Sequence, residues 1–436
     1  MQKFIAVLLM LAAFFVSKAD NWPQWRGPFW NGSSAEHNLP SDWSKTENVA
    51  WSLPLPGPGA ATPVIWEDHV LLSSTDSQNQ SLLALAVDRK SGKVLWQHKI
   101  SDGLRRDNRS TFASPSPVTD GRRVIFFYST GDLAAFDFTG QKLWARNIQT
   151  DYGTFAFLWT FSSSPLLYEG KLYLQVLQRD IPVDGRGRQD GPNDSYLLAM
   201  DPATGKTLWR QVRPSAAVGE SREAFTTPVP LVHQGRAELL LFGGDCLTGH
   251  DPASGKELWR WETWNPTRIG HWRLVPSAVA GDGIILASAP KGAPIYAIKA
   301  GGAGLLHDEA VAWKSDPQRA VTADVPTPLF YDGDFFVLSD MRKNLSRLEP
   351  KTGRVKWSLQ TPGSAKYEAS PTGADGKVYL MNFKGEVVVV DAAQGQVLRT
   401  IPMGEAGDDS TRSSIAVAQG QLFIRVNQKV YCVGKK

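Results

Sequence analysis

Short apolar runs alternate with polar turns along most of this chain, and a glycine opens many of the runs. Three of them are residues 121–127 (GRRVIFF), 170–176 (GKLYLQV) and 376–382 (GKVYLMN). Another apolar run follows, such as EVVVVDA at residues 386–392. Runs this short, bounded by turn residues and rich in β-branched and aromatic side chains, are typical of β-strands. The pattern therefore predicts an all-β chain of short strands joined by tight turns.

One segment recurs six times: an acidic residue, then a glycine, and four residues after the glycine a tryptophan in five of the six copies. The copies are residues 88–96 (DRKSGKVLW), 137–144 (DFTGQKLW), 201–209 (DPATGKTLW), 251–259 (DPASGKELW), 349–357 (EPKTGRVKW) and 391–399 (DAAQGQVLR). A repeat of about 40–50 residues built from short strands predicts a β-propeller with one four-stranded blade per repeat. The period predicts the fold and leaves the function open.

The glycine and the tryptophan of each copy have separate expected roles. Gly92 supplies the positive φ of a tight turn, and the acidic residue before it can accept backbone N–H groups. Because side chains alternate with period two, the tryptophan, Trp96 in the first copy, lies on the same face each time. A large ring there favours packing between neighbouring blades, with stacking on a ligand as the alternative. The tryptophans assigned to this repeat position are Trp51, Trp96, Trp144, Trp209, Trp259, Trp313 and Trp357.

Counting the repeats predicts eight blades. The first seven begin near Ala61, Ser114, Ser163, Thr226, Pro276, Pro326 and Ala369. The fifth copy, residues 276–316, is irregular, with an inserted loop before Trp313. An eighth copy from Ser413 shows only three strands, so we expect residues 48–55, which contain Trp51, to supply the fourth. The N-terminal strand would then close the ring and remove its open sheet edges.

The first residues have the pattern of a secretory leader. Lys3 precedes an apolar stretch over residues 4–16, and SKA at residues 17–19 forms a small-x-small cleavage pattern before Asp20. The apolar stretch is short for a transmembrane helix, and no cysteine stands near the cleavage pattern to carry a lipid anchor. We expect a cleaved leader and a periplasmic or secreted protein without a membrane span; an uncleaved anchor is the alternative.

The composition fits one exported domain. The 436 residues carry a net charge of +4 without a clustered basic stripe, so we expect no nucleic-acid partner. Cys246 and Cys432 fall in distant repeats, which predicts two free, mostly buried thiols although export permits disulfides. We expect a monomer in three parts: a leader over residues 1–19, an extended segment over residues 20–47, and an eight-bladed PQQ-like propeller over residues 48–436.

The repeats resemble the pyrroloquinoline-quinone (PQQ) repeats of quinoprotein alcohol dehydrogenase-like propellers, from Trp51 to the C-terminus. Residues 21–32 (NWPQWRGPFWNG) and 39–59 (LPSDWSKTENVAWSLPLPGPG) are similar to exported PQQ-repeat propellers of planctomycete-type bacteria. The resemblance implies one fold and two kinds of function. One is PQQ- and calcium-dependent dehydrogenation of alcohols or sugars. The other is non-catalytic scaffolding, as in the outer-membrane assembly propeller, which binds peptide segments of its partners, so the site must decide between them.

Motifs for catalysis are sparse in the sequence. It contains no adjacent cysteines, no C-x-x-C-H haem attachment and no dense loop of oxygen ligands for calcium. Its seven histidines form no zinc motif, and no G-x-S-x-G elbow or phosphate-binding P-loop is present. We therefore nominate no catalytic residue and no metal ligand, and we expect no resident cofactor. PQQ with Ca²⁺ stays open as the alternative.

The loops that precede the first strand of each blade carry the candidate site. In a propeller these loops gather at one mouth of the central channel, here called the rim. They are rich in arginine, aromatic and acidic residues, as in residues 102–112 (DGLRRDNRSTF) and 263–274 (TWNPTRIGHWRL). Arginine offers a planar fork for carboxylates or phosphates, and tryptophan offers a stacking face. The candidate ligand-binding residues are Arg109, Trp159, Glu223, Trp272, Arg273, Asp324, Glu368 and Arg412.

Two functions follow from these observations. We expect an exported, non-catalytic binding or scaffold propeller whose ligand is a protein, a peptide or a carbohydrate. The alternative is a PQQ-dependent oxidoreductase of an alcohol or sugar, with the quinone in the channel mouth. The missing cofactor motifs favour the first function, and the arginine- and tryptophan-rich rim supports the second. A third interpretation of the rim is a ring of ion pairs that neutralise one another without a ligand.

Overall fold

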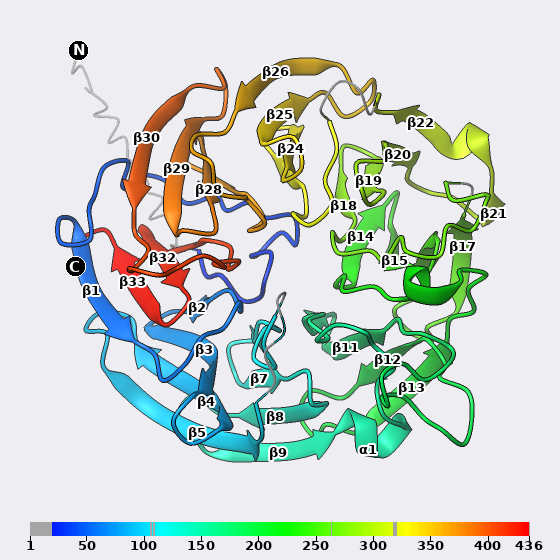
Figure 1. Cartoon of the computed structure of the whole chain (residues 1–436), viewed down its shortest axis with the longest axis horizontal. Coiled ribbons are helices and arrows are strands. Elements are labelled where there is room, and N and C mark those ends of the chain that lie inside the picture. The colour runs from blue at the N-terminus through cyan, green and yellow to red at the C-terminus, as the bar shows by residue number, and fades with distance from the viewer. Residues whose placement is uncertain (1–19, 105–106, 108–109, 263, 317–320, 436) are drawn as a thin grey trace, which may run out of the picture.

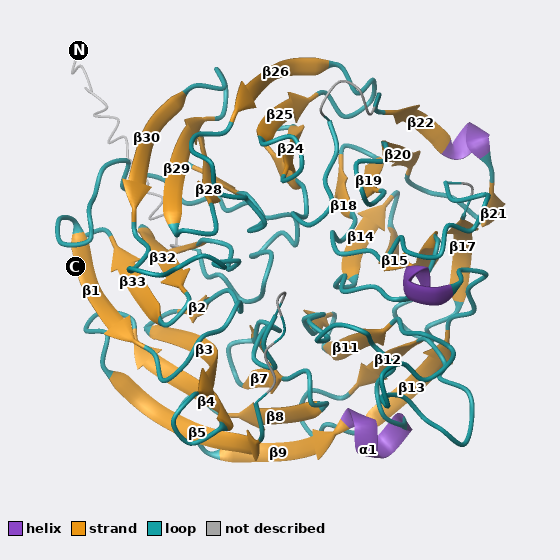
Figure 2. Ribbon diagram, viewed as in Figure 1, coloured by secondary structure: helices purple, strands orange, loops and turns teal. Residues whose placement is uncertain are grey.

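The chain forms a closed ring of eight β-sheets around a central axis, with only short helices between them (Figures 1 and 2). The computed structural model describes residues 20–104, 107, 110–262, 264–316 and 321–435. The predicted all-β, eight-bladed propeller is confirmed. The leader over residues 1–19 and the candidate Arg109 lie outside the described residues.

In the first four blades, antiparallel strands run outward from the channel in chain order. The first blade is β2 (Val64–Trp66), β3 (His69–Asp76), β4 (Ser81–Asp88) and β5 (Val94–Asp102). The second is β6 (Val118–Thr119), β7 (Val124–Phe127), β8 (Asp132–Phe136) and β9 (Lys142–Asn147), followed by helix α1 (Ile148–Tyr152). The third is β10 (Leu166–Tyr168), β11 (Lys171–Val176), β12 (Tyr196–Met200) and β13 (Thr207–Val212). The fourth is β14 (Val229–His233), β15 (Arg236–Gly243), β16 (Cys246–His250) and β17 (Glu257–Trp261).

The other four blades repeat this order, with one insertion and one closing strand. The fifth is β18 (Val279–Gly281), β19 (Ile284–Ser288), β20 (Ile295–Lys299) and β22 (Val311–Lys314). The sixth is β23 (Leu329–Tyr331), β24 (Asp334–Ser339), β25 (Asn344–Leu348) and β26 (Val355–Gln360). The seventh is β27 (Thr372–Ala374), β28 (Lys377–Met381), β29 (Glu386–Asp391) and β30 (Val397–Pro402). The eighth is β31 (Ala416–Ala418), β32 (Gln421–Val426), β33 (Lys429–Val433) and β1 (Val49–Pro54).

Burial separates the middle strands from the outer ones. In β4 every residue except the last is buried, because neighbouring blades cover both faces. In β5 exposed and half-buried residues alternate, since only one face of this outer strand meets a neighbour. The core is therefore divided into apolar layers between neighbouring blades, whose sheets stack face to face.

The repeat tryptophans lie between blades, each against the turn glycine of the next blade. A Cβ added to these glycines would lie 2.5–2.7 Å from the ring, so only glycine allows this close approach. The pairs are Trp51–Gly92, Trp96–Gly140, Trp144–Gly205, Trp209–Gly255, Trp313–Gly353 and Trp357–Gly395. Most of these indoles also donate their N–H to a carbonyl of the same turn, as Trp144 does to Pro202 at 2.9 Å. Five of the eight junctions between blades are thus made by one ring and one hydrogen bond, whereas the indole N–H of Trp209 has no partner among the described residues.

Trp259 is the exception, because the irregular fifth blade offers it no turn glycine. Its N–H donates to the buried carboxylate of Glu238 in its own blade, at 2.6 Å. The inserted loop predicted before Trp313 contributes β21 (Gly304–Leu306), which pairs in parallel with β17 as a fifth strand. The insertion therefore adds a strand to the outer edge of the preceding blade.

The N-terminal strand closes the ring. Strand β1, blue in Figure 1, pairs antiparallel with β33, red, and Trp51 lies opposite Cys432. This pairing gives the eighth blade its fourth strand, as the sequence predicts. Cys246 and Cys432 are both buried and free, which confirms the expectation for the thiols. Within the described part of the chain, no helix is long and apolar enough to cross a membrane.

Residues 20–36, here called the belt, run across the face of the ring opposite the rim. Trp22 exchanges two backbone hydrogen bonds with Ile65 of β2, both 2.9 Å long. At its other end, the carbonyl of Gly32 accepts from Gly373 of β27, in the seventh blade, at 3.0 Å. The dark-blue trace in Figure 1 accordingly passes the centre of the ring. The belt ties the first blade to the seventh.

Arg26 fixes the belt at the axis. Its guanidinium is buried and donates to the carbonyls of Pro371 at 3.0 Å and Pro328 at 2.9 Å. Burial away from water lowers the pKa of Arg26 to about 9. Because these carbonyls belong to two neighbouring blades, Arg26 holds the belt where the first strands converge.

Candidate functional site

A ring of hydroxyl groups surrounds the central axis. Each blade begins with a serine or threonine near the proline that precedes its first strand, and in seven of the eight blades its backbone N–H donates to the hydroxyl of the next blade. These bonds are 2.9–3.2 Å long and run from Thr62 to Ser116, Ser116 to Ser164, Ser164 to Thr227, Thr227 to Ser277, Ser277 to Thr327, Thr327 to Ser370, and Ser414 to Thr62. The hydroxyl oxygens satisfy strand-end N–H groups that would otherwise lack partners.

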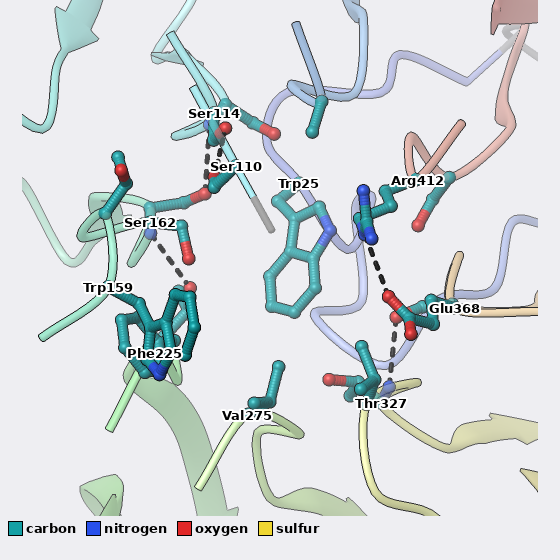
Figure 3. Close-up of a pocket in the computed structure, with 18 of the residues that line it drawn as sticks. Trp25, Ser110, Ser114, Trp159, Ser162, Phe225, Val275, Thr327, Glu368 and Arg412 are labelled. Carbon is teal, nitrogen blue, oxygen red and sulfur yellow. Dashed lines mark hydrogen bonds and ion pairs between the residues drawn. The ribbon is translucent and has the colours of Figure 1, made fainter. Parts of the chain in front are cut away.

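The belt closes this ring from one side, which produces a well. Trp25 of the belt projects into the axis and lies at the centre of the residues drawn in Figure 3. The cavity has a volume of about 160 Å³, and hydroxyls including Ser116, Ser164 and Thr327 line its wall. The belt bonds to residues that follow a ring hydroxyl in the sequence; Gly373, for example, comes three residues after Ser370. The rim residues come before a ring hydroxyl. The belt and the rim therefore lie at opposite ends of the first strands. The well therefore has a tryptophan base, a hydroxyl wall and an open rim.

The rim combines apolar side chains with paired charges. Phe225, Val275 and Val325 border the cavity, and so do Trp159 and Arg273. The indole N–H of Trp159 donates to Glu220 at 3.2 Å. Arg273 forms an ion pair with the same carboxylate at 3.0 Å. On this side of the mouth, Trp159 and Arg273 are thus both bound to the carboxylate of Glu220.

Glu368 and Arg412 form a second ion pair on the other side of the mouth. Arg412 Nε lies 2.8 Å from the buried Glu368 carboxylate, as Figure 3 shows, and both residues line the cavity. The guanidinium also stacks over Phe383, 4.5 Å from the ring centroid. A second cavity of about 520 Å³ shares Glu368 and Arg412 with the well and extends outward past Asp409 and Asn427. The well therefore opens into a groove over the rim.

Four of the eight candidate residues line the well: Trp159, Arg273, Glu368 and Arg412. Three others lie elsewhere on the same face. Glu223 is buried against Arg179, and burial raises the pKa of its carboxyl. Trp272 stacks on Trp264 with centroids 6.0 Å apart, and Asp324 pairs with Lys291 at 3.8 Å. These three side chains have partners within the protein and do not line the cavity.

The sequence analysis did not nominate Trp25, Glu220 or the hydroxyl ring. Trp25 belongs to NWPQWRGPFWNG, which occurs once and carries no repeat signal. Serine or threonine stands near each blade-opening proline in the sequence, and this recurrence is the signal from which the ring could be predicted. In the described residues, no three His, Cys, Asp or Glu side chains gather closely enough to hold a metal ion.

Solved structures with the same fold include a BamB protein and dehydrogenases. BamB from Moraxella catarrhalis is 12% identical, with a TM-score of 0.60 over 89% of this chain and 99% of that chain. A europium-containing methanol dehydrogenase is 11% identical, with a TM-score of 0.65 over 93% of this chain and 89% of that chain. The quinohemoprotein alcohol dehydrogenase from Comamonas testosteroni is 13% identical, with a TM-score of 0.62 over 95% and 81%. At these identities the likeness shows the fold alone.

Sequence comparison identifies the family more directly. A search of curated proteins finds no match to this chain. A family model described as outer membrane protein assembly factor BamB matches residues 42–178, 155–303 and 243–436. Because these matches together span the whole ring of blades, the chain belongs to this family of PQQ-repeat propellers.

Proposed function

We propose that the protein is an exported, non-catalytic binding propeller that takes a peptide segment of a partner protein into its well and groove. The size of the well carries this proposal. A cavity of roughly 150 Å³ accommodates one benzene ring, whereas cofactor pockets usually measure about 300–1,000 Å³. The well, at about 160 Å³, matches one side chain of a bound peptide.

The chemistry of the well suits such a side chain. Phe225, Val275 and Trp159 offer apolar contact at the mouth, and the hydroxyls of Ser116 and Ser164 lie deeper. Each of these hydroxyls accepts a neighbour's N–H and can still donate its own hydrogen into the well. An amphipathic side chain with an apolar body and an acceptor at its tip would therefore be bound at both ends. The adjoining groove has room for the flanking residues of the peptide.

PQQ fits the same cavity poorly. The face of Trp25 could stack on a planar quinone, which is the observation that favours this alternative. However, PQQ is a tricyclic tricarboxylate, and the two arginines at the mouth are already paired with Glu220 and Glu368. Both acids would lie close to the carboxylates of the quinone and repel them. The charges at the mouth of the well therefore do not suit PQQ.

Two further observations support the proposal. The family match is to an assembly factor, and the similar BamB structure covers 89% of this chain. The leader pattern, together with the likeness of residues 21–32 to exported propellers of planctomycete-type bacteria, supports export.

Selection of displayed random peptides on immobilised protein would test the proposal. We expect enriched peptides that share one apolar anchor residue and bind about tenfold or more weakly to Trp159→Ala, because a buried aromatic contact is lost. Leu208→Ala, on an exposed outer strand, is the matched control and should leave affinity unchanged. Enriched peptides that bind Trp159→Ala as well as the parent protein would contradict the assignment of the well.

The same purified protein can be used to distinguish peptide binding from PQQ-dependent oxidation. PQQ with Ca²⁺ is added, and tryptophan fluorescence and dye-linked oxidation of alcohols and aldoses are followed. Saturable quenching with turnover would replace the binding proposal with the oxidoreductase.

A further inference from the structure

Glu36 is a buried carboxylate whose contacts are all backbone nitrogens. It is 7% exposed, and it accepts from Gly420 at 2.7 Å, from Gln419 at 3.0 Å and from the backbone nitrogen of Asp20 at 2.5 Å. Among the described residues, no lysine, arginine or histidine forms an ion pair with it. The three N–H groups stabilise this carboxylate, and a positive charge on one of the three nitrogens would stabilise it further.

Three hydrogen bonds hold Asp20 at this position. Its carboxylate accepts from the backbone of Ala35 at 3.1 Å, and its carbonyl accepts from Gln419 at 3.3 Å. Its backbone nitrogen, the shortest contact of the three, points to Glu36. The cradle is therefore formed by the end of the belt and by the turn between β31 and β32.

The sequence places the expected leader cleavage immediately before this residue, after SKA at residues 17–19. We infer that the chain is processed between Ala19 and Asp20, and that Glu36 is the receptor for the α-ammonium group so formed. An endopeptidase of the export pathway would catalyse the hydrolysis. Water adds across the Ala19–Asp20 peptide bond, Ala19 leaves with a carboxylate, and the nitrogen of Asp20 becomes an ammonium group. That nitrogen already lies 2.5 Å from the carboxylate oxygen.

The ion pair would lock the belt, and with it the base of the well. Asp20 and Glu36 are 16 residues apart, at the two ends of the belt, so their pairing closes the belt on itself. Between them, Trp25 lies in the channel and Arg26 binds two blades. This inference concerns maturation, and it stands whether or not the well binds a peptide.

Two measurements test the inference. Intact mass spectrometry of protein exported from the full-length gene should give a chain that begins at Asp20. Hydrogen–deuterium exchange should then compare that chain with its enzymatically N-acetylated form, which loses the ammonium charge and carries no substitution. We expect the belt amides of Trp22 and Ser34 to exchange roughly tenfold faster after acetylation, because a charge-assisted bond is weakened.

Two variants assign the effect to Glu36. In Glu36→Gln, acetylation should no longer change the exchange rates, whereas in Glu47→Gln, an exposed carboxylate used as the control, the full effect should persist. A mature chain that starts at any other residue would overturn the inference. So would an acetylation effect that is absent, or that is equally large without Glu36.

Discussion

At the scale of single residues, several arginines bind backbone carbonyls in the interior. Arg213 is 1% exposed and follows β13 of the third blade. It donates to the carbonyls of Gly243 at 2.9 Å and Cys246 at 2.9 Å and to the hydroxyl of Thr248 at 2.8 Å, all in the fourth blade. Burial lowers the pKa of Arg213. Arg425 plays the same part between the eighth and first blades, so guanidinium groups join blades that Trp209 and Trp51 also join.

We predict that Arg213→Lys destabilises the protein by about 3 kcal/mol, because lysine has three donors at one point and cannot reproduce the planar fork. Carbonyls of the fourth blade would then be left without partners. Urea unfolding followed by tryptophan fluorescence measures the change. Arg122→Lys, at an exposed turn, is the control and should lie close to the parent protein. Equal midpoints for the two variants would contradict this role of Arg213.

Asp340, in the turn between β24 and β25, predicts a dependence of stability on pH. Burial, together with the nearby Asp324 and Glu368 charges, raises the pKa of Asp340 to about 6. Between about pH 4 and pH 6 the folded protein retains a proton that the unfolded chain has released. The free energy of unfolding should therefore fall by about 2–3 kcal/mol as pH rises through this window.

Asp340→Asn tests this prediction, because asparagine can still accept the N–H of Asp324 but does not titrate. Urea midpoints measured from pH 4 to pH 7 should lose this part of the slope in the variant. Asp42→Asn, at an exposed site, should keep the slope of the parent protein. Identical slopes in the parent and Asp340→Asn would show that burial does not raise this pKa.

At the scale of elements, the contact of tryptophan with glycine makes neighbouring blades depend on each other. Gly205 has φ +70°, and an added Cβ would lie 2.6 Å from Trp144. Gly235, in the turn between β14 and β15, has φ +80° with nothing within 4 Å of the added atom. An alanine would therefore be strained by the positive φ at both positions, but only at Gly205 would its Cβ clash with a neighbouring side chain.

We predict that Gly205→Ala costs roughly 1–3 kcal/mol more than Gly235→Ala, since only the first forces a ring out of its site. Both variants should share a strain penalty of about 1–2 kcal/mol. Thermal unfolding monitored by circular dichroism would measure the difference. If the two variants unfold together, the close approach does not stabilise the junction between the blades.

The strands and blades could be predicted from the sequence more completely than the candidate site. The turn glycines and the tryptophans, Trp96 for example, act within a local repeat, so strands and blade number follow from the sequence. The position of Trp25 depends on contacts with blades several hundred residues away, and no local pattern encodes it. Trp272 shows the opposite case. An indole can stack on a ligand, which is why the sequence nominates this residue, but Trp272 stacks on Trp264 of the same loop.

At the scale of the whole molecule, ring closure and the belt can be separated. A chain that begins at residue 38 loses the belt but keeps β1, so we expect a monomeric ring of lower thermal stability. A chain that begins at residue 56 also loses β1 and exposes the edge of β33, which favours association through that edge. Size-exclusion chromatography with light scattering should show a monomer for the first and aggregates for the second. A monomeric second chain would mean that closure does not protect the edge.

The contacts of the belt also order the steps of folding in time. Asp20 is the first described residue, yet it bonds to Gln419, 399 positions later. During synthesis the belt can therefore pair early with β2 of the first blade, whereas its contacts with the sixth, seventh and eighth blades form only after those blades have been made. A chain that stops before the eighth blade would therefore lack the contacts that hold Asp20 and Glu36 at the two ends of the belt.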